Sequence, residues 1–79
     1  MANVSIDRSL AEDLVSTKLR FVVEEIESIL VKWQYQSADL FIHDAREGKI
    51  LEAEDDAITL RHLLDQREEL FSLRSSWTP

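Results

Sequence analysis

The chain has 79 residues, 44% of them hydrophobic and 32% charged, and its sixteen acidic and nine basic residues give a formal net charge of −7. The absence of cysteine excludes disulfides and thiolate metal sites, and the short apolar runs exclude a membrane-spanning segment. Net negative charge without a basic cluster disfavours nucleic acid as a partner. A single domain of this size buries only about 60% of its unfolded surface, so we expect it to oligomerise.

Within the first eight residues, 3–8 alternate apolar and polar side chains around Val4 and Ile6. This alternation is typical of a short strand or an extended arm, which we expect over residues 1–8. The segment lacks the basic region and apolar core of a secretory signal. We therefore expect a cytoplasmic protein whose helical part begins at Ser9.

A long amphipathic helix is predicted over residues 9–33. Ser9 and Glu12 have the spacing of a capping box at its start. Its apolar residues repeat at alternating intervals of four and three, and two further residues widen the stripe: Val15, Leu19, Val22, Ile26, Ile29 and Trp33, with Val23 and Leu30 beside them. The stripe is too wide for one partner helix, so we expect it to form the core and a dimer interface.

Two more helices are predicted, over residues 38–47 and 52–74. Ser37 is placed to cap the first, and Gly48, the only glycine, stands where a left-handed residue should end it. The second has a stripe formed by Ala53, Ala57, Leu60, Leu64 and Phe71, and residues 75–79 should fray. The predicted fold is all-α: residues 9–33 and 52–74 form an antiparallel hairpin around the short helix, in a dimeric bundle.

The segment from Ser37 to Asp56 concentrates negative charge. It contains two basic residues and seven acidic ones: Asp39, Asp44, Glu47, Glu52, Glu54, Asp55 and Asp56. Such a surface can steer a basic protein partner, although solubility and helix dipoles account for the same carboxylates equally well. Trp77, an aromatic residue in the tail, is expected to dock on the dimer partner.

Neither histidine has the neighbours of a strong metal site. His43 has Glu47 four residues on, and His62 has Asp65 three residues on, so each can share a helix face with a carboxylate. No second histidine lies at ligand spacing, and we interpret both as surface ion pairs rather than metal ligands. We expect no cofactor.

The carboxylates Glu24, Glu25 and Glu27, with the pair Glu52 and Asp55, resemble motifs of the all-α nucleotide pyrophosphatases of the MazG and dUTPase-like kind. Those enzymes bind magnesium through an EExxE run on one helix and an ExxD pair on the next. Here Ser28 takes the place of the third glutamate. The resemblance implies a metal-dependent enzyme as an alternative to our main hypothesis, which is a protein without enzymatic activity.

Residues 3–14 resemble the opening of small prokaryotic antitoxins and ribbon-helix-helix repressors, and residues 41–56 are similar in style to antitoxin tails that wrap a basic toxin. Ser5 and Asp7 are not the basic or amide residues that such repressors insert into DNA, and the helix that follows is about twice the expected length. The resemblance therefore implies toxin neutralisation without DNA binding. We predict a small acidic interaction or regulatory protein; a structural subunit of a larger assembly is the third possibility.

Overall fold

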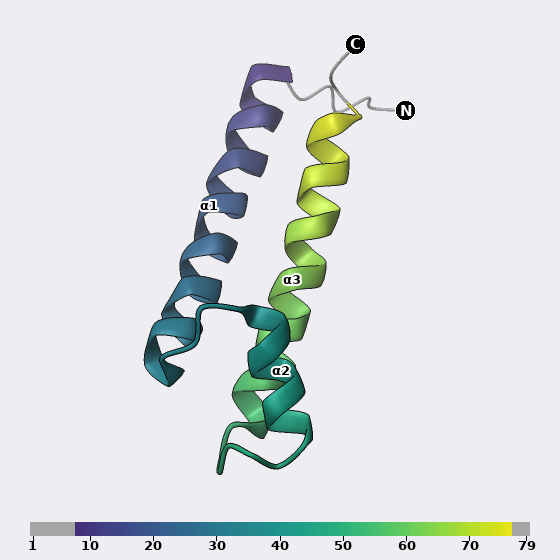
Figure 1. Ribbon diagram of the computed structural model, residues 1–79. Coiled ribbons are helices and arrows are strands. Elements are labelled where there is room, and N and C mark those ends of the chain that lie inside the picture. Colours follow the sequence, from purple (N-terminus) through teal and green to yellow (C-terminus); the bar gives the residue numbers. More distant parts are fainter. Residues whose placement is uncertain (1–7, 77–79) are drawn as a thin grey trace.

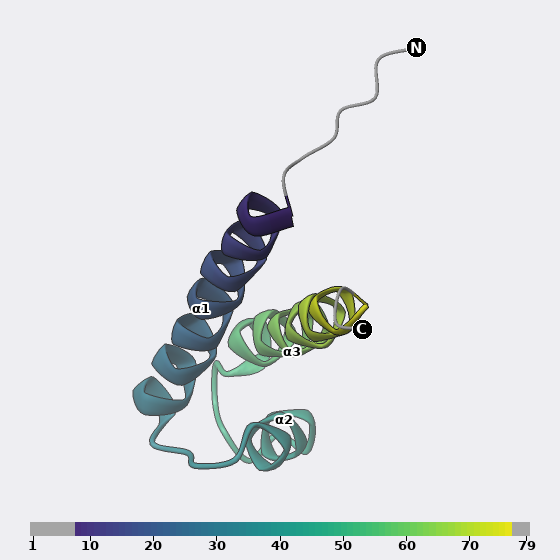
Figure 2. The same cartoon turned by 90° about the horizontal axis from the view of Figure 1, so that it is seen from above.

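The computed structural model describes residues 8–76, which form three helices and no strand. They are α1 (Arg8–Trp33), α2 (Ala38–Arg46) and α3 (Glu54–Ser75). α1 and α3 run antiparallel, and α2 packs at one end of this hairpin (Figure 1). Viewed from above, α3 lies beside both α1 and α2 (Figure 2). The predicted all-α fold and the close packing of the two long helices are confirmed. None of the helices in residues 8–76 is long and apolar enough to cross a bilayer.

The first and third helices begin at different residues from those predicted. α1 includes Arg8, whose Nε lies 3.0 Å from Glu12 Oε1, so Ser9 stands inside the first turn instead of capping it. α3 begins after Glu52, because that residue has a left-handed backbone (φ 61°) that cannot continue into a helix. Ala53 then takes the N-cap position without a side-chain hydrogen bond. Arg8, the last residue of the arm predicted over residues 1–8, therefore belongs to α1. Residues 1–7 of that arm and Trp77 lie outside the described residues.

The α1–α2 corner is closed by local hydrogen bonds. Gln34 has a left-handed backbone (φ 60°), and its N–H donates to the carbonyl oxygen of Val31 at 3.1 Å. The N–H of Tyr35 donates to the carbonyl oxygen of Leu30 at 2.9 Å, which completes a Schellman motif. Ser37 Oγ then accepts from the N–H of Leu40 at 3.2 Å, confirming the predicted cap of α2.

The same motif ends α2. Gly48 has φ 74°, as predicted, and its N–H donates to the carbonyl oxygen of Ala45 at 3.2 Å. The N–H of Lys49 donates to the carbonyl oxygen of Asp44 at 2.9 Å. These bonds satisfy carbonyl groups that a helix end otherwise leaves unpaired, and they reverse the chain towards α3.

The central core lies at the end of the hairpin where α2 packs. Phe41 of α2 and Leu60 of α3 are its two fully buried large side chains. The other members of this cluster are Val22, Ile26, Ala53, Ala57 and Leu63. We call this part the closed half, and the remainder of the hairpin, residues 8–21 and 64–76, the open half. Phe71 was expected in the buried stripe but is 45% exposed, because α2 does not extend to the open half.

The molecule is therefore elongated. Its principal extents are 53 × 24 × 19 Å, and its radius of gyration is 16.2 Å. A compact chain of this length would have a radius of gyration of about 12 Å. Along the open half, α1 and α3 pack only against each other, without a third helix.

Candidate interaction surfaces

Most of the predicted interface stripe on α1 packs within the chain itself. Val15, Leu19, Val22 and Ile26 are buried against the rest of the fold. Val23, Ile29, Leu30 and Trp33 are half-buried, and the last three pack against the core cluster. Because α2 and α3 cover this stripe, its main role in the single chain is to form the core.

A second apolar face of α1 is exposed. Leu10, Leu14 and Phe21 are 53%, 57% and 57% exposed, and their spacing of four and seven places them on one side of the helix. At about 100° per residue, this face lies roughly a third of a turn from the buried stripe. Sequence reasoning missed it because the longer stripe dominated the pattern, although the same spacing rule would have revealed it.

The C-terminal half of α3 adds further exposed apolar surface. Phe71 and Leu73 are 45% and 44% exposed, and both belong to the open half. Removing a large apolar side chain of this kind from water lowers the free energy of the protein. The open half therefore presents apolar side chains on both of its helices.

Three aromatic rings pack together at the closed end. The ring centroids of Trp33 and Phe41 are 5.8 Å apart, and Tyr35 meets Phe41 edge-on at 5.4 Å. Such tilted and edge-to-face pairs are favourable arrangements of aromatic quadrupoles. The cluster places the polar atoms of Trp33 and Tyr35 next to two carboxylates.

Asp56 joins the end of α1 to the start of α3. Its Oδ2 accepts from Lys32 Nζ at 2.7 Å and from Trp33 Nε1 at 2.8 Å. These two hydrogen bonds, that from Lys32 first, hold the pKa of Asp56 below its usual value. The carboxylate of Asp56 therefore stabilises the contact between α1 and α3 and is already bound within the chain.

Asp44 has a comparable structural role. Its Oδ2 accepts from the hydroxyl of Tyr35 at 2.7 Å, and its Oδ1 lies 3.9 Å from Lys49 Nζ. The hydrogen bond to Asp44 raises the pKa of the Tyr35 phenol, because it favours the protonated form. Of the seven predicted partner carboxylates, these two are half-buried, and the other five are exposed: Asp39, Glu47, Glu52, Glu54 and Asp55.

The structure places the histidines on the surface. His43 Nε2 lies 3.8 Å from Glu47 Oε1, and His62 is exposed on α3. The pyrophosphatase-like carboxylates Glu24, Glu25 and Glu27 are exposed on α1, and Glu52 and Asp55 are exposed at the start of α3. Within residues 8–76, no three histidine, aspartate or glutamate side chains converge as metal ligands would.

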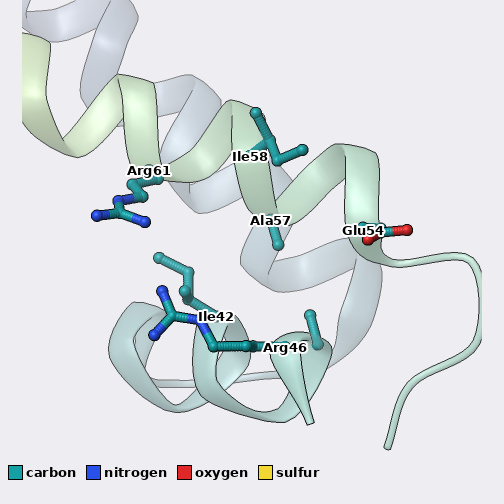
Figure 3. A pocket seen from close by; sticks show the side chains of 7 residues that line it. Ile42, Arg46, Glu54, Ala57, Ile58 and Arg61 are labelled. Carbon is teal, nitrogen blue, oxygen red and sulfur yellow. The ribbon is translucent and has the colours of Figure 1, made fainter. Parts of the chain in front are cut away.

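A pocket of about 230 Å³ lies between α2 and α3 (Figure 3). Ile42, Ala57 and Ile58 form its apolar lining, and Arg46, Arg61 and Glu54 stand around it. No sequence pattern indicates this pocket, because its residues come from two helices whose packing against each other the hydrophobic periodicity does not specify.

Comparisons with protein-family models, with curated proteins and with solved structures found no match for this chain.

Proposed function

We propose that this protein has no enzymatic activity and acts through protein–protein contact, as a homodimer whose acidic surface binds a basic partner in the manner of an antitoxin. The observation that carries this proposal is the exposed apolar face formed by Leu10, Leu14 and Phe21. Large apolar side chains grouped on one side of a helix are typical of an interface.

The energetics favour association through the open half. Each large apolar side chain that is removed from water contributes about 1.5–3 kcal/mol when fully buried. A single chain of 79 residues is only marginally stable by itself. A second copy packed on the α1 face would cover surface that α2 is too short to reach.

The acidic part of the proposal rests on the five exposed carboxylates around α2 and the start of α3. They lie in the closed half, away from the apolar face of α1. A field of one sign accelerates the approach of a partner of opposite charge. The two surfaces can therefore act independently, one in self-association and the other in recognition.

Sedimentation velocity over a dilution series tests the self-association. We expect a species of twice the 9.2 kDa chain mass at high micromolar concentration, and dissociation on dilution. A mass of one chain at every concentration would contradict the proposed dimer.

Co-purification with a basic ribonuclease-like protein tests the recognition. We expect a variant combining Asp39→Asn, Glu47→Gln and Asp55→Asn to lose such a partner, and raised salt to release it from the wild type. The matched control combines Glu24→Gln, Glu25→Gln and Glu27→Gln, which removes the same charge from α1. Equal retention by both variants would contradict a role for the acidic surface.

A further inference from the structure

The pocket between α2 and α3 carries positive charge in a chain with a net charge of −7. Arg46 comes from the last turn of α2, and Arg61 lies seven residues after the first residue of α3. Figure 3 shows both guanidinium groups on the same side of the pocket, with Ile42 between them, while the carboxylate of Glu54 points away. The pocket thus combines two cations with an apolar lining.

Neither guanidinium is neutralised within the fold. Arg46 and Arg61 make no hydrogen bond and no ion pair with any of residues 8–76, whereas Lys32 and Lys49 each approach a carboxylate. Two like charges held on one side of a pocket repel each other, and an anion placed between them relieves that repulsion. The planar guanidinium group is also suited to paired hydrogen bonds with a carboxylate.

The apolar lining selects for a ligand with an apolar body. Ala57 is buried, Ile42 is half-buried, and Ile58 is 54% exposed in the open pocket. A ring or branched chain resting there would cover Ile58 while its acid group faces the two arginines. Pockets for drug-sized ligands measure about 300–1,000 Å³. The volume here, about 230 Å³, suits a smaller molecule.

We propose that this pocket binds a small organic carboxylate with an aromatic or branched aliphatic body. Arg46 and Arg61 hold the carboxylate, and Ile42, Ala57 and Ile58 contact the apolar part. The occupant is a free small molecule because the pocket is bounded by one turn of α2 and two turns of α3, too short a length for an extended peptide. The site is separate from the apolar face of α1 and does not depend on the dimer.

The test is a titration of the isotopically labelled full chain with 3-phenylpropanoate, followed by NMR amide shifts. A ligand this small is expected to bind with a Kd of about 1 mM, so the titration extends to about 10 mM. We expect saturable shifts confined to residues 42–46 and 54–61. The neutral amide of the same acid and acetate, which lacks the apolar body, should each bind roughly tenfold more weakly.

Arg46→Gln and Arg61→Gln should each weaken binding of 3-phenylpropanoate by roughly tenfold. Arg46 and Arg61 are both exposed, so the two variants should retain the wild-type helical circular dichroism and melting temperature. Arg20 on α1 is exposed as well, so Arg20→Gln is the matched control and should leave the affinity unchanged.

Three results would overturn the proposal. One is the absence of a saturable shift at the highest ligand concentration. Another is equal binding of the acid and its neutral amide, which would make the arginines irrelevant. The third is a shift of the pocket amides when the protein alone is diluted, since that would place a second copy of the chain in the pocket.

Discussion

At the level of single residues, two non-glycine positions among residues 8–76 have a left-handed backbone, Gln34 and Glu52. This conformation crowds the β-carbon of an L residue and costs about 1–2 kcal/mol. Gln34 ends α1 and is exposed, so its side chain contributes little in compensation. The Schellman hydrogen bonds at Val31 and Leu30 maintain it there.

Gln34→Gly is therefore expected to stabilise the fold by about 1 kcal/mol, because glycine adopts this backbone without a steric penalty. Urea unfolding followed by circular dichroism measures the change. The control, Gln34→Ala, keeps a β-carbon and should leave the free energy of unfolding nearly unchanged. A destabilised glycine variant would show that the Gln34 side chain matters more than its backbone.

Tyr35 provides a second residue-scale prediction, since it is the only tyrosine of the chain. Its hydrogen bond to Asp44 raises the phenol pKa above 10.0. Because the neutral phenol is favoured in the fold, this contribution to stability is present below pH 10 and is lost as the pH rises through the folded-state pKa.

Phenolate absorbance should thus titrate with a midpoint above 10.0 in the wild type. In Asp44→Ala the midpoint should move back towards that value. Helical circular dichroism recorded at the same pH values establishes that the chain is still folded. A wild-type midpoint at or below 10 would contradict the hydrogen bond.

At the level of elements, Asp56 connects the last turn of α1 to the first turn of α3. Asp56→Ala leaves the half-buried indole N–H of Trp33 without its acceptor, at an expected cost of about 1–3 kcal/mol. Asp55→Ala is the matched control, because it removes a neighbouring exposed charge from the same helix start, worth about 0.3–1 kcal/mol.

The same carboxylate predicts a pH dependence. Its pKa is lowered from 3.8 by the hydrogen bonds from Lys32 and Trp33, so its contribution is fully present above pH 3.8 and is lost as the pH falls through the lower folded-state pKa. The stability difference between wild type and Asp56→Ala should shrink over that range. A difference that is independent of pH would show that the contact does not depend on the charge of Asp56.

The helices themselves could be predicted because their signals are local. The spacing of four and three residues between Val15, Leu19 and Val22 follows from the helical repeat of about 3.6 residues alone. The cap formed by Ser37 and the left-handed backbone of Gly48 are each determined by a few neighbouring residues. Glu52 was placed wrongly because its negative charge suits a helix start, whereas its left-handed backbone excludes it from the helix.

The candidate site could be predicted only in part. The sequence does not distinguish the seven carboxylates of the acidic segment from one another. In the folded chain, Asp44 accepts a hydrogen bond from Tyr35. Asp56 accepts hydrogen bonds from Lys32 and Trp33. The pairing of Arg46 with Arg61 likewise requires the packed arrangement of α2 and α3. Contacts between distant segments leave no periodic signal, so they appear only in the folded chain.

At the level of the whole molecule, the central core occupies only one part of the molecule's length. The molecule extends over 53 Å, but α2 and the fully buried residues Phe41 and Leu60 occupy only the closed half. The open half exposes Leu10, Leu14 and Phe21. An elongated chain with apolar side chains on its outer surface can gain stability by association. We therefore infer that the open half is where a second copy binds.

Sedimentation equilibrium of Leu14→Glu beside the wild type tests this claim most directly. Burying an unpaired carboxylate in an apolar interface is costly, so we expect the variant to sediment as a single 9.2 kDa chain at concentrations where the wild type has twice that mass. Leu51→Glu is the control, since Leu51 is more exposed and lies in the α2–α3 turn, and it should remain dimeric. A Leu14→Glu variant that associates as strongly as the wild type would contradict the proposed interface.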